Sequence, residues 1–212
     1  MAERGLRSER VATWRGAEPL VTLDAHIPPG QVLTVMGPSG VGKSTLLAFA
    51  IGTLPAAFRG EGSIRLNGRE LTGLPTAARK VGILFQDDLL FPHLTVAGNL
   101  AFGLPPGTRD RRARVDAALR EVGLEDFGPR DPATLSGGQK ARVALMRMLL
   151  SAPDALLLDE PFARLDADRR RQIRDLVFSA ARALPVVMVT HDRADAEAAG
   201  GPVIEIGAKP GS

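Results

Sequence analysis

One stretch of the chain has the residue types and the spacing to bind phosphate groups: Gly37-Pro38-Ser39-Gly40-Val41-Gly42-Lys43-Ser44-Thr45. It fits the pattern G-x-x-x-x-G-K-[ST], whose glycines allow a tight turn with backbone N–H groups that point inward at an anion. Lys43 would place its charge near the β- and γ-phosphates, and the Ser44 hydroxyl would reach Mg²⁺. The stretch therefore predicts a binding site for a nucleoside triphosphate.

The segments on either side of this loop have the patterns that a phosphate site requires. Residues 32–36 (VLTVM) are an apolar run that predicts a buried strand, and residues 44–50 (STLLAFA) predict the start of a helix. A helix N-terminus adds partial positive charge to an anion site. The alternative interpretation is a glycine-rich turn without chemical meaning, and it requires neither flank. The flanks therefore favour phosphate binding.

Two neighbouring carboxylates end an apolar run further along the chain. Residues 155–158 (ALLL) predict a buried strand, and Asp159 and Glu160 follow it directly. In proteins with a phosphate loop, an acidic residue at such a strand end holds Mg²⁺, commonly through water. Glu160 would then polarise the attacking water, so that one acid serves the metal and the other is a general base. The alternative is that both acids merely end a strand in solvent. The phosphate loop upstream argues against this alternative.

A second turn with open backbone N–H groups is predicted at Leu135-Ser136-Gly137-Gly138-Gln139. Ser136 has the character of a helix N-cap, and the two glycines leave N–H groups exposed at the start of a helix over 139–150. This arrangement makes a second anion site. A single triphosphate bound at Lys43 does not need such a site.

The order of the remaining segments predicts an α/β fold. Compact apolar runs at 155–158 and 186–190 are typical of parallel strands covered on both faces, with a crossover helix expected between them at 168–184. Between about 87 and 150 the pattern changes to helices. Further short strands are expected at 10–14, 20–26, 31–36, 60–67, 80–86 and 203–207.

The composition is that of an ordinary globular domain. The 212 residues carry a net charge of +3, and the absence of cysteine excludes disulfides and Cys-based metal sites. Nucleic acid is a disfavoured partner because aromatic residues for stacking are few, with one Trp and eight Phe. The charged start MAERGLRSER does not have the pattern of a signal peptide, and no apolar run reaches the roughly 20 residues that span a bilayer. We therefore expect a cytosolic chain that meets a membrane only through a partner.

The phosphate loop, the LSGGQ turn and the Asp159-Glu160 pair, in this order, resemble the nucleotide-binding subunit of ATP-binding cassette (ABC) transporters. The resemblance covers essentially the whole chain. It implies an α/β P-loop NTPase core with an N-terminal antiparallel β-subdomain and an inserted helical subdomain at about 87–150. It also implies a single domain over 1–212, with no room for the C-terminal regulatory domain that many relatives carry.

The resemblance implies roles for single residues as well. Gln86, at the end of KVGILFQ, matches the glutamine that links Mg²⁺ and water to the membrane partner, and His191 matches the histidine that senses the γ-phosphate. Trp14 matches the aromatic residue that stacks on adenine. Each has a structural alternative: a polar strand end for Gln86, a structural histidine for His191 and simple packing for Trp14.

The same resemblance implies ATP and Mg²⁺ as ligands and a head-to-tail homodimer, in which each ATP contacts both copies. The implied catalytic residues are Glu160, His191 and Gln86. The implied metal ligands are Ser44, Gln86 and, through water, Asp159. The residues implied to contact ATP, from the two copies together, are Trp14, the loop 37–45, Ser136, Gly137, Gly138, Gln139 and Asp166.

The sequence departs from the family after Glu160. The family usually has a small Ser-Ala pair before Leu-Asp, and this chain has Ala163-Arg164 in that place, with Asp166 retained. This loop normally crosses the dimer interface, so the bulky Arg164 sets the usual packing there in question. His93, within the phrase FPHLT, is expected at the surface that faces the membrane subunit and not as a metal ligand.

The implied function is ATP hydrolysis on the cytoplasmic face of the bacterial inner membrane. This hydrolysis powers the import of a solute. The phrase at 84–105 resembles import ATPases, and the chain is most similar to the YnjD-like group among them. The implied partners are transmembrane permease subunits and a periplasmic or lipid-anchored solute-binding protein. The solute itself is not implied, because its specificity resides in those partners.

Three other functions compete with import. An export ATPase shares every ATP-site motif, and only the FPHLT phrase argues against it. A soluble ABC protein of translation or DNA repair usually carries two cassettes or long insertions, which this sequence does not show. A metabolite kinase with a phosphate loop has no use for LSGGQ.

Overall fold

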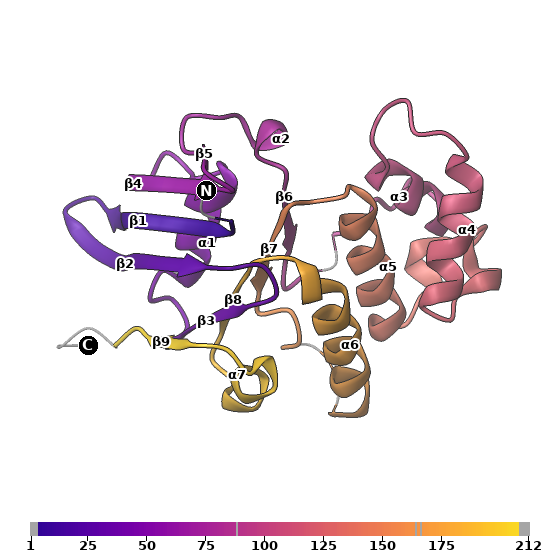
Figure 1. Cartoon of the computed structure of the whole chain (residues 1–212). Coiled ribbons are helices and arrows are strands. Elements are labelled where there is room, and N and C mark those ends of the chain that lie inside the picture. The colour runs from indigo at the N-terminus through magenta and orange to yellow at the C-terminus, as the bar shows by residue number, and fades with distance from the viewer. Residues whose placement is uncertain (1–3, 88, 164, 166, 208–212) are drawn as a thin grey trace. The chain divides into compact units, whose positions relative to one another are not determined.

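The structure is a computed structural model that describes residues 4–87, 89–163, 165 and 167–207. These residues form two compact units (Figure 1). The core unit consists of the described residues of 1–83, 154–160 and 181–212. The helical unit consists of those of 84–153 and 161–180.

A parallel sheet with buried central strands lies in the core unit. Its strands are β3 (Val32–Met36), β6 (Val81–Leu84), β7 (Ala155–Asp159), β8 (Val186–Thr190) and β9 (Val203–Glu205), in the order β6-β7-β8-β3-β9. Strand β3 pairs in parallel with β8 and β9, and β7 pairs in parallel with β8. Continuous aliphatic runs suit strands covered on both faces. The apolar runs in the sequence therefore predicted the central strands correctly.

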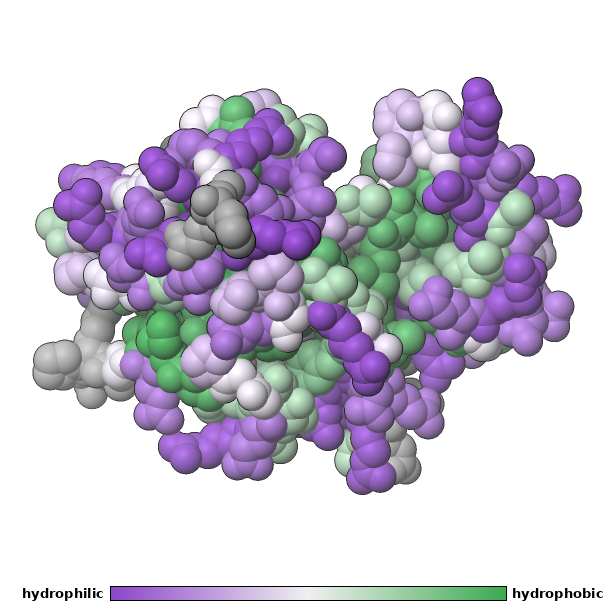
Figure 2. Space-filling view, in the orientation of Figure 1, coloured by the Kyte–Doolittle hydropathy of each residue, from purple (hydrophilic) through white to green (hydrophobic). Residues whose placement is uncertain are grey.

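An antiparallel sheet forms the N-terminal part of the core unit. It contains β1 (Leu6–Arg15), β2 (Glu18–Ile27), β4 (Phe58–Leu66) and the short β5 (Arg69–Glu70), in the order β2-β1-β4-β5. Hydrophilic side chains dominate the side of this sheet that Figure 2 shows. The α/β fold with an N-terminal antiparallel part is thus confirmed.

Helix α1 (Lys43–Ile51) is buried in the core unit, where it contacts strands of both sheets. Its side chains are apolar on several sides, and they join one hydrophobic cluster with residues of β1, β3, β4 and β7. A helix that is apolar around much of its circumference must be covered. Apolar packing therefore holds α1 against strands of both sheets. The unit also contains α2 (Thr76–Arg79), α7 (Arg193–Ala199) and a 3₁₀ turn at Ala181–Ala183.

The strand order brings three functional segments to one edge of the parallel sheet. The phosphate loop follows β3, Glu160 follows β7, and His191 follows β8. Ligands of open α/β sheets bind at the carboxyl ends of the strands. The predicted catalytic residues of the core unit therefore lie at the edge where such ligands bind.

The helical unit has an apolar core of its own, built from residues such as Leu100, Leu119 and Val143. Its helices are α3 (Val96–Gly103), α4 (Arg111–Glu121), α5 (Gly137–Leu150) and α6 (Ala167–Ala180), with 3₁₀ turns at Glu125–Phe127 and Pro132–Thr134. Helix α6, expected as the crossover between β7 and β8, contacts α5. Within the described ranges, no helix is long and apolar enough to cross a bilayer. That both units act as a single domain stays a prediction.

Candidate functional site

The phosphate loop runs from the end of β3 to the start of α1, and close packing requires two of its glycines. Gly42 has a φ of 110°, and a Cβ there would lie 2.7 Å from the Cβ of Leu20. A Cβ on Gly37 would lie 2.8 Å from the carbonyl oxygen of Ile206. A side chain at either position would push the loop off its neighbours. These glycines therefore fix the path of the loop.

Lys43, the first residue of α1, directs its ammonium group back into the loop. Its side chain is 6% exposed, and Nζ donates hydrogen bonds to the carbonyl oxygens of Gly37 at 2.7 Å and Pro38 at 2.9 Å. The first turn of α1 contains no acidic residue that would offset its positive end. The loop therefore presents a buried cation beside a helix N-terminus, which is a favourable environment for phosphate.

Ser44 and Asp159 bring two oxygen ligands together. Ser44 Oγ donates a hydrogen bond to Asp159 Oδ1 at 3.0 Å. Burial raises the pKa of the Asp159 carboxyl, and the hydrogen bond from Ser44 offsets only part of this effect. A bound cation would relieve the cost of burying the carboxylate, and hydroxyl and carboxylate oxygens are ligands that Mg²⁺ prefers. The two residues therefore fit the predicted metal site.

Gln86, the third predicted ligand, follows β6 in the helical unit and has an exposed side chain. Its ligand role stays a prediction. In the part of the chain that the structure describes, no group of three or more histidine or acidic residues is placed to hold a metal ion. Mg²⁺ typically takes one or two carboxylates and completes its shell with water and substrate phosphates. A site in which Asp159 supplies the carboxylate is consistent with that coordination.

Glu160 lies between a histidine and the lysine of the loop. Its Oε2 is 2.9 Å from His191 Nδ1, and its Oε1 is 3.7 Å from Lys43 Nζ. The Glu160 side chain is 13% exposed, and its φ of 47° is uncommon for a residue with a Cβ. The backbone N–H of Glu160 donates to the carbonyl of Val189 on β8, which holds this conformation.

The two neighbouring acids have different partners because β7 ends between them. Asp159 is the last residue of β7 and accepts from Ser44, whereas Glu160 contacts His191. Backbone conformations that the surrounding structure imposes are concentrated at functional sites. The pair therefore offers a carboxylate to a metal ion on one side and a proton acceptor on the other.

Trp14 lies on β1 of the antiparallel sheet and is partly exposed. Its cross-strand neighbour on β4 is Arg59, whose guanidinium carbon lies 4.5 Å from the centre of the indole ring. This is a cation–π contact. The sequence did not single out Arg59, because strand pairing alone brings it to Trp14. Stacking of Trp14 on adenine stays a prediction.

Ser136 caps helix α5, as the sequence predicted. Its Oγ accepts a hydrogen bond from Gln139 N at 3.4 Å, and Gln139 Oε1 accepts one from Ser136 N at 2.9 Å. This reciprocal pair is a capping box. Ser136 and Gly137 are exposed, while Gly138 is buried. A Cβ on Gly137 would meet nothing within 4 Å, so the turn has room for a ligand, and the second anion site stays a prediction.

Asp166 and Arg164 lie outside the described residues, so their roles at a dimer interface stay predictions. Phe162, just before them, is fully buried in the helical unit. Its ring packs edge to face on Phe178, with ring centres 6.0 Å apart. The segment that follows Glu160 is therefore attached to the helical unit by an aromatic contact.

Comparison with known proteins supplies the family context. The sequence model described as ABC transporter matches residues 20–163. The uncharacterized ABC transporter ATP-binding protein YnjD of Escherichia coli (strain K12) is 51% identical over 183 residues, which cover 84% of this chain and 84% of that protein.

Several similar proteins have names that state a substrate. The thiamine import ATP-binding protein ThiQ of Jannaschia sp. (strain CCS1) is 46% identical over 185 residues, which cover 83% of this chain and 79% of that protein. The sulfate/thiosulfate import ATP-binding protein CysA of Caulobacter vibrioides is 42% identical over 183 residues, which cover 82% of this chain and 53% of that protein.

Replacing Asp159 with Asn tests the burial of this carboxylate. Because folding raises the pKa of Asp159, the charged form costs stability above the folded pKa, and this cost disappears as the pH falls and the group is protonated. Asn keeps an oxygen that accepts from Ser44 and carries no charge. We expect metal-free Asp159→Asn to melt a few degrees above wild type at pH 8, with a difference that shrinks toward pH 4.

Thermal melts with and without Mg²⁺ provide the control. The ion should stabilise wild type more than Asp159→Asn, because the variant offers it no charge. A variant that is less stable than wild type at pH 8 without metal would show that the buried carboxylate carries no cost.

Proposed function

Because the chain belongs to the ABC transporter family, whose ATP-binding subunits hydrolyse ATP, we propose that it powers the import of a solute into a bacterial cell. The relatives with a named substrate are import proteins, for thiamine and for sulfate/thiosulfate. This likeness favours import over export and over a soluble role. The observation that carries the chemistry is the contact of Glu160 with His191 beside the Lys43 ammonium.

ATP binds with its β- and γ-phosphates on the loop 37–45. Lys43 exchanges its hydrogen bonds to loop carbonyls for bonds to phosphate oxygens, which carry more negative charge. Ser44, Asp159 and Gln86 would hold Mg²⁺, which would supply positive charge to offset that of the triphosphate. Trp14 stacks on adenine.

Glu160 is the general base of hydrolysis. A water molecule gives a proton to the Glu160 carboxylate while its oxygen attacks the γ-phosphorus. The bond between that phosphorus and the bridging oxygen breaks, and ADP and inorganic phosphate leave. His191 holds the carboxylate through Nδ1, which leaves its other ring nitrogen for the γ-phosphate. Rate enhancement comes from positioning and charge stabilisation, without a covalent intermediate.

Two copies of the chain assemble head to tail around the nucleotide. Ser136 and Gly137 are exposed at the N-terminus of α5, and the first turn of this helix contains no acidic residue. Such a helix N-terminus binds an anion. A triphosphate on the loop of the same chain already has the N-terminus of α1. Residues 136–139 and Asp166 of one copy therefore close the ATP that is bound to the other copy.

A permease subunit docks on the helical unit. An apolar hollow of about 530 Å³ lies between α3 and α4, with Ala97, Ala101 and Val115 in its lining. Figure 2 shows apolar side chains gathered around α3 and α5, and Phe102 on α3 is 65% exposed. Exposed apolar surface of this kind marks an interaction site. The occupant is an apolar cytoplasmic segment of the permease.

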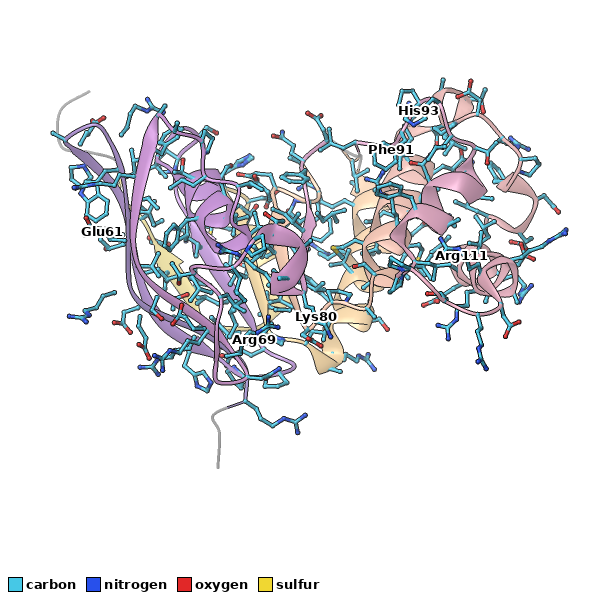
Figure 3. All side chains as sticks on the ribbon, turned by 90° about the horizontal axis from the view of Figure 1, so that it is seen from above. Glu61, Arg69, Lys80, Phe91, His93 and Arg111 are labelled. Carbon is cyan, nitrogen blue, oxygen red and sulfur yellow. The ribbon has the colours of Figure 1, made fainter. Side chains whose placement is uncertain are left out.

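One buried amide fixes the shape of the segment Phe91–Thr95, whose last residue lines the hollow. Asn99 accepts a hydrogen bond from Phe91 N at 2.8 Å and donates to the carbonyls of Phe91 and Thr95, both at 3.1 Å. The rings of Phe91 and His93 lie close together, with 5.8 Å between their centres (Figure 3). This fixed display of aromatic side chains supports the expectation that His93 faces the permease.

The assembled transporter sets the location of the chain. The permease crosses the inner membrane and receives solute from a periplasmic or lipid-anchored solute-binding protein. The chain works on the cytoplasmic face of that membrane. Recognition of the solute belongs to these partners, since the chemistry of the ATP site does not depend on the cargo.

Replacing Glu160 with Gln keeps the size of the side chain and removes the base. We expect ATP hydrolysis to fall by roughly 10²-fold or more, the scale of a lost general base, while ATP still binds. Phosphate release measures hydrolysis, and equilibrium dialysis measures binding. Glu121→Gln, at an exposed acid at the end of α4, is the matched control and should hydrolyse ATP as wild type does. Unchanged turnover in Glu160→Gln would remove this residue from its role.

Trp14 is the only tryptophan of the chain, so the tryptophan fluorescence reports on whether adenine stacks on its ring. We expect ATP to quench or shift this emission. Trp14→Ala should raise the dissociation constant for ATP by a few-fold to tenfold, matching roughly 1 kcal/mol of aromatic contact. Inorganic triphosphate, which has no base, should bind both proteins equally. Fluorescence that does not respond to ATP would favour simple packing of Trp14.

Hydrolysis by the isolated subunit should rise more steeply than linearly with protein concentration, because each site needs two copies. Ser136→Arg should suppress hydrolysis and spare ATP binding. In a mixture with the inactive Lys43→Ala chain, the mixed dimer retains one site with intact Lys43 and intact Ser136, so activity should return. A specific activity independent of concentration, together with a fully active Ser136→Arg, would overturn the dimer.

A further inference from the structure

Arg79, the last residue of α2, is a buried cation that none of the roles above uses. The residue is 5% exposed, and burial lowers the pKa of its guanidinium below the ordinary arginine value. A buried arginine must satisfy its N–H donors. The guanidinium donates to four backbone carbonyl oxygens, those of Phe49 at 3.0 Å, Ala50 at 2.8 Å, Thr72 at 2.8 Å and Leu74 at 2.9 Å.

Two of these acceptors belong to the last turn of α1, the helix that carries Lys43 at its other end. Arg79 Nη1 donates to both Phe49 and Ala50, where donors within the helix run out. Thr76 Oγ1 adds a hydrogen bond to the carbonyl of Gly52 at 3.2 Å. The segment around α2 therefore caps the C-terminus of α1 with side chains.

The end of α1 is built around this guanidinium. Gly52 ends the helix with a φ of 84°, and a Cβ there would lie 2.6 Å from both Cζ and Nε of Arg79. Glycine is therefore required for the left-handed backbone and for the space that the guanidinium occupies.

A cation at the C-terminus of a helix is stabilised by the helix dipole. Helix α1 has 9 residues, so the guanidinium lies about 13 Å along the helix axis from the phosphate-binding end, at 1.5 Å per residue. The helix between these ends is packed in the apolar core, where charges are weakly screened. Arg79 thus fixes one end of α1 and adds positive potential to the other.

We propose that Arg79 is a positioning residue of the ATP site. By holding the C-terminus of α1 it sets the place of Lys43 and Ser44 at the N-terminus, although it contacts neither phosphate nor metal. This inference rests on the proposed function, which places the phosphates at the N-terminus of α1.

Arg79→Met tests the inference, because it keeps an apolar stem and removes the charge and every donor. At a temperature where circular dichroism shows the variant folded, we expect the dissociation constant for ATP to rise about fivefold to tenfold. The dissociation constant for inorganic triphosphate should rise by the same factor, because Arg79 affects the binding of the phosphates. A merely structural role would lower the melting temperature and leave both constants unchanged. A value for ATP within twofold of wild type would overturn the inference.

Arg111→Met is the matched control. The Arg111 guanidinium also caps a helix, with hydrogen bonds to the carbonyls of Ala101, Leu104 and Pro105 at the end of α3. Its loss should lower thermal stability and leave the dissociation constants for ATP and triphosphate at wild-type values. If Arg111→Met weakens ATP as much as Arg79→Met does, the effect is general and the inference fails.

Two further variants keep the test decisive. If Arg79→Met does not fold, Arg79→Lys replaces it, because lysine retains the charge with fewer donors. The dissociation constant for ATP should then rise about threefold. A wild-type value in Arg79→Lys would overturn the inference. Lys43→Ala separates the inference from the proposed function. If Lys43→Ala binds triphosphate as wild type does, the phosphates do not lie at α1 and the proposed function fails. If Lys43→Ala no longer binds triphosphate and Arg79→Met binds it as wild type does, only the role of Arg79 fails.

Discussion

An ammonium group inside a folded chain needs hydrogen-bond acceptors and negative charge nearby. Lys43 finds its acceptors in the carbonyls of Gly37 and Pro38, and Glu160 lies 3.7 Å from the same nitrogen. The loop can fold back on the lysine because Gly42 tolerates the close approach of Leu20 on β2 and Gly37 that of Ile206. The phosphate loop, the start of α1 and the end of β7 thus surround a single buried charge.

The order of the parallel strands explains why these groups meet. Both β3 and β7 pair with β8, so the loop after β3 and the acids at the end of β7 lie on either side of the segment that carries His191. Residues that are far apart in sequence therefore share one edge of the sheet. The positive φ of Glu160 turns its side chain toward His191, while Asp159 keeps the direction of the strand and reaches Ser44.

The features that the sequence predicted well are those that a short pattern decides. The central strands follow from apolar runs, and the N-cap at Ser136 follows from a hydroxyl before a glycine pair and a glutamine. The spacing of the phosphate loop likewise identifies Lys43 as the residue that enters the loop, which its hydrogen bonds match. These patterns depend on residues within one turn or one strand, so tertiary packing does not have to be known.

The features that the sequence did not predict depend on pairs that folding brings together. Arg79 lies in the stretch TAARK, whose composition is typical of an exposed segment. The residue is nevertheless buried against the end of α1. Arg59 meets Trp14 only through the register of β1 and β4, and Asn99 fixes the shape of the segment Phe91–Thr95 through backbone groups. No spacing rule connects such residues, since each contact needs the packed chain.

A crystal structure of Glu160→Gln with ATP and Mg²⁺ would show directly how the nucleotide is bound. The proposed chemistry predicts two copies of the chain, with each γ-phosphate between Lys43 of one copy and Ser136 of the other, and with His191 beside the reacting phosphate. ATP held by a single copy, with Ser136 remote from every phosphate, would contradict it.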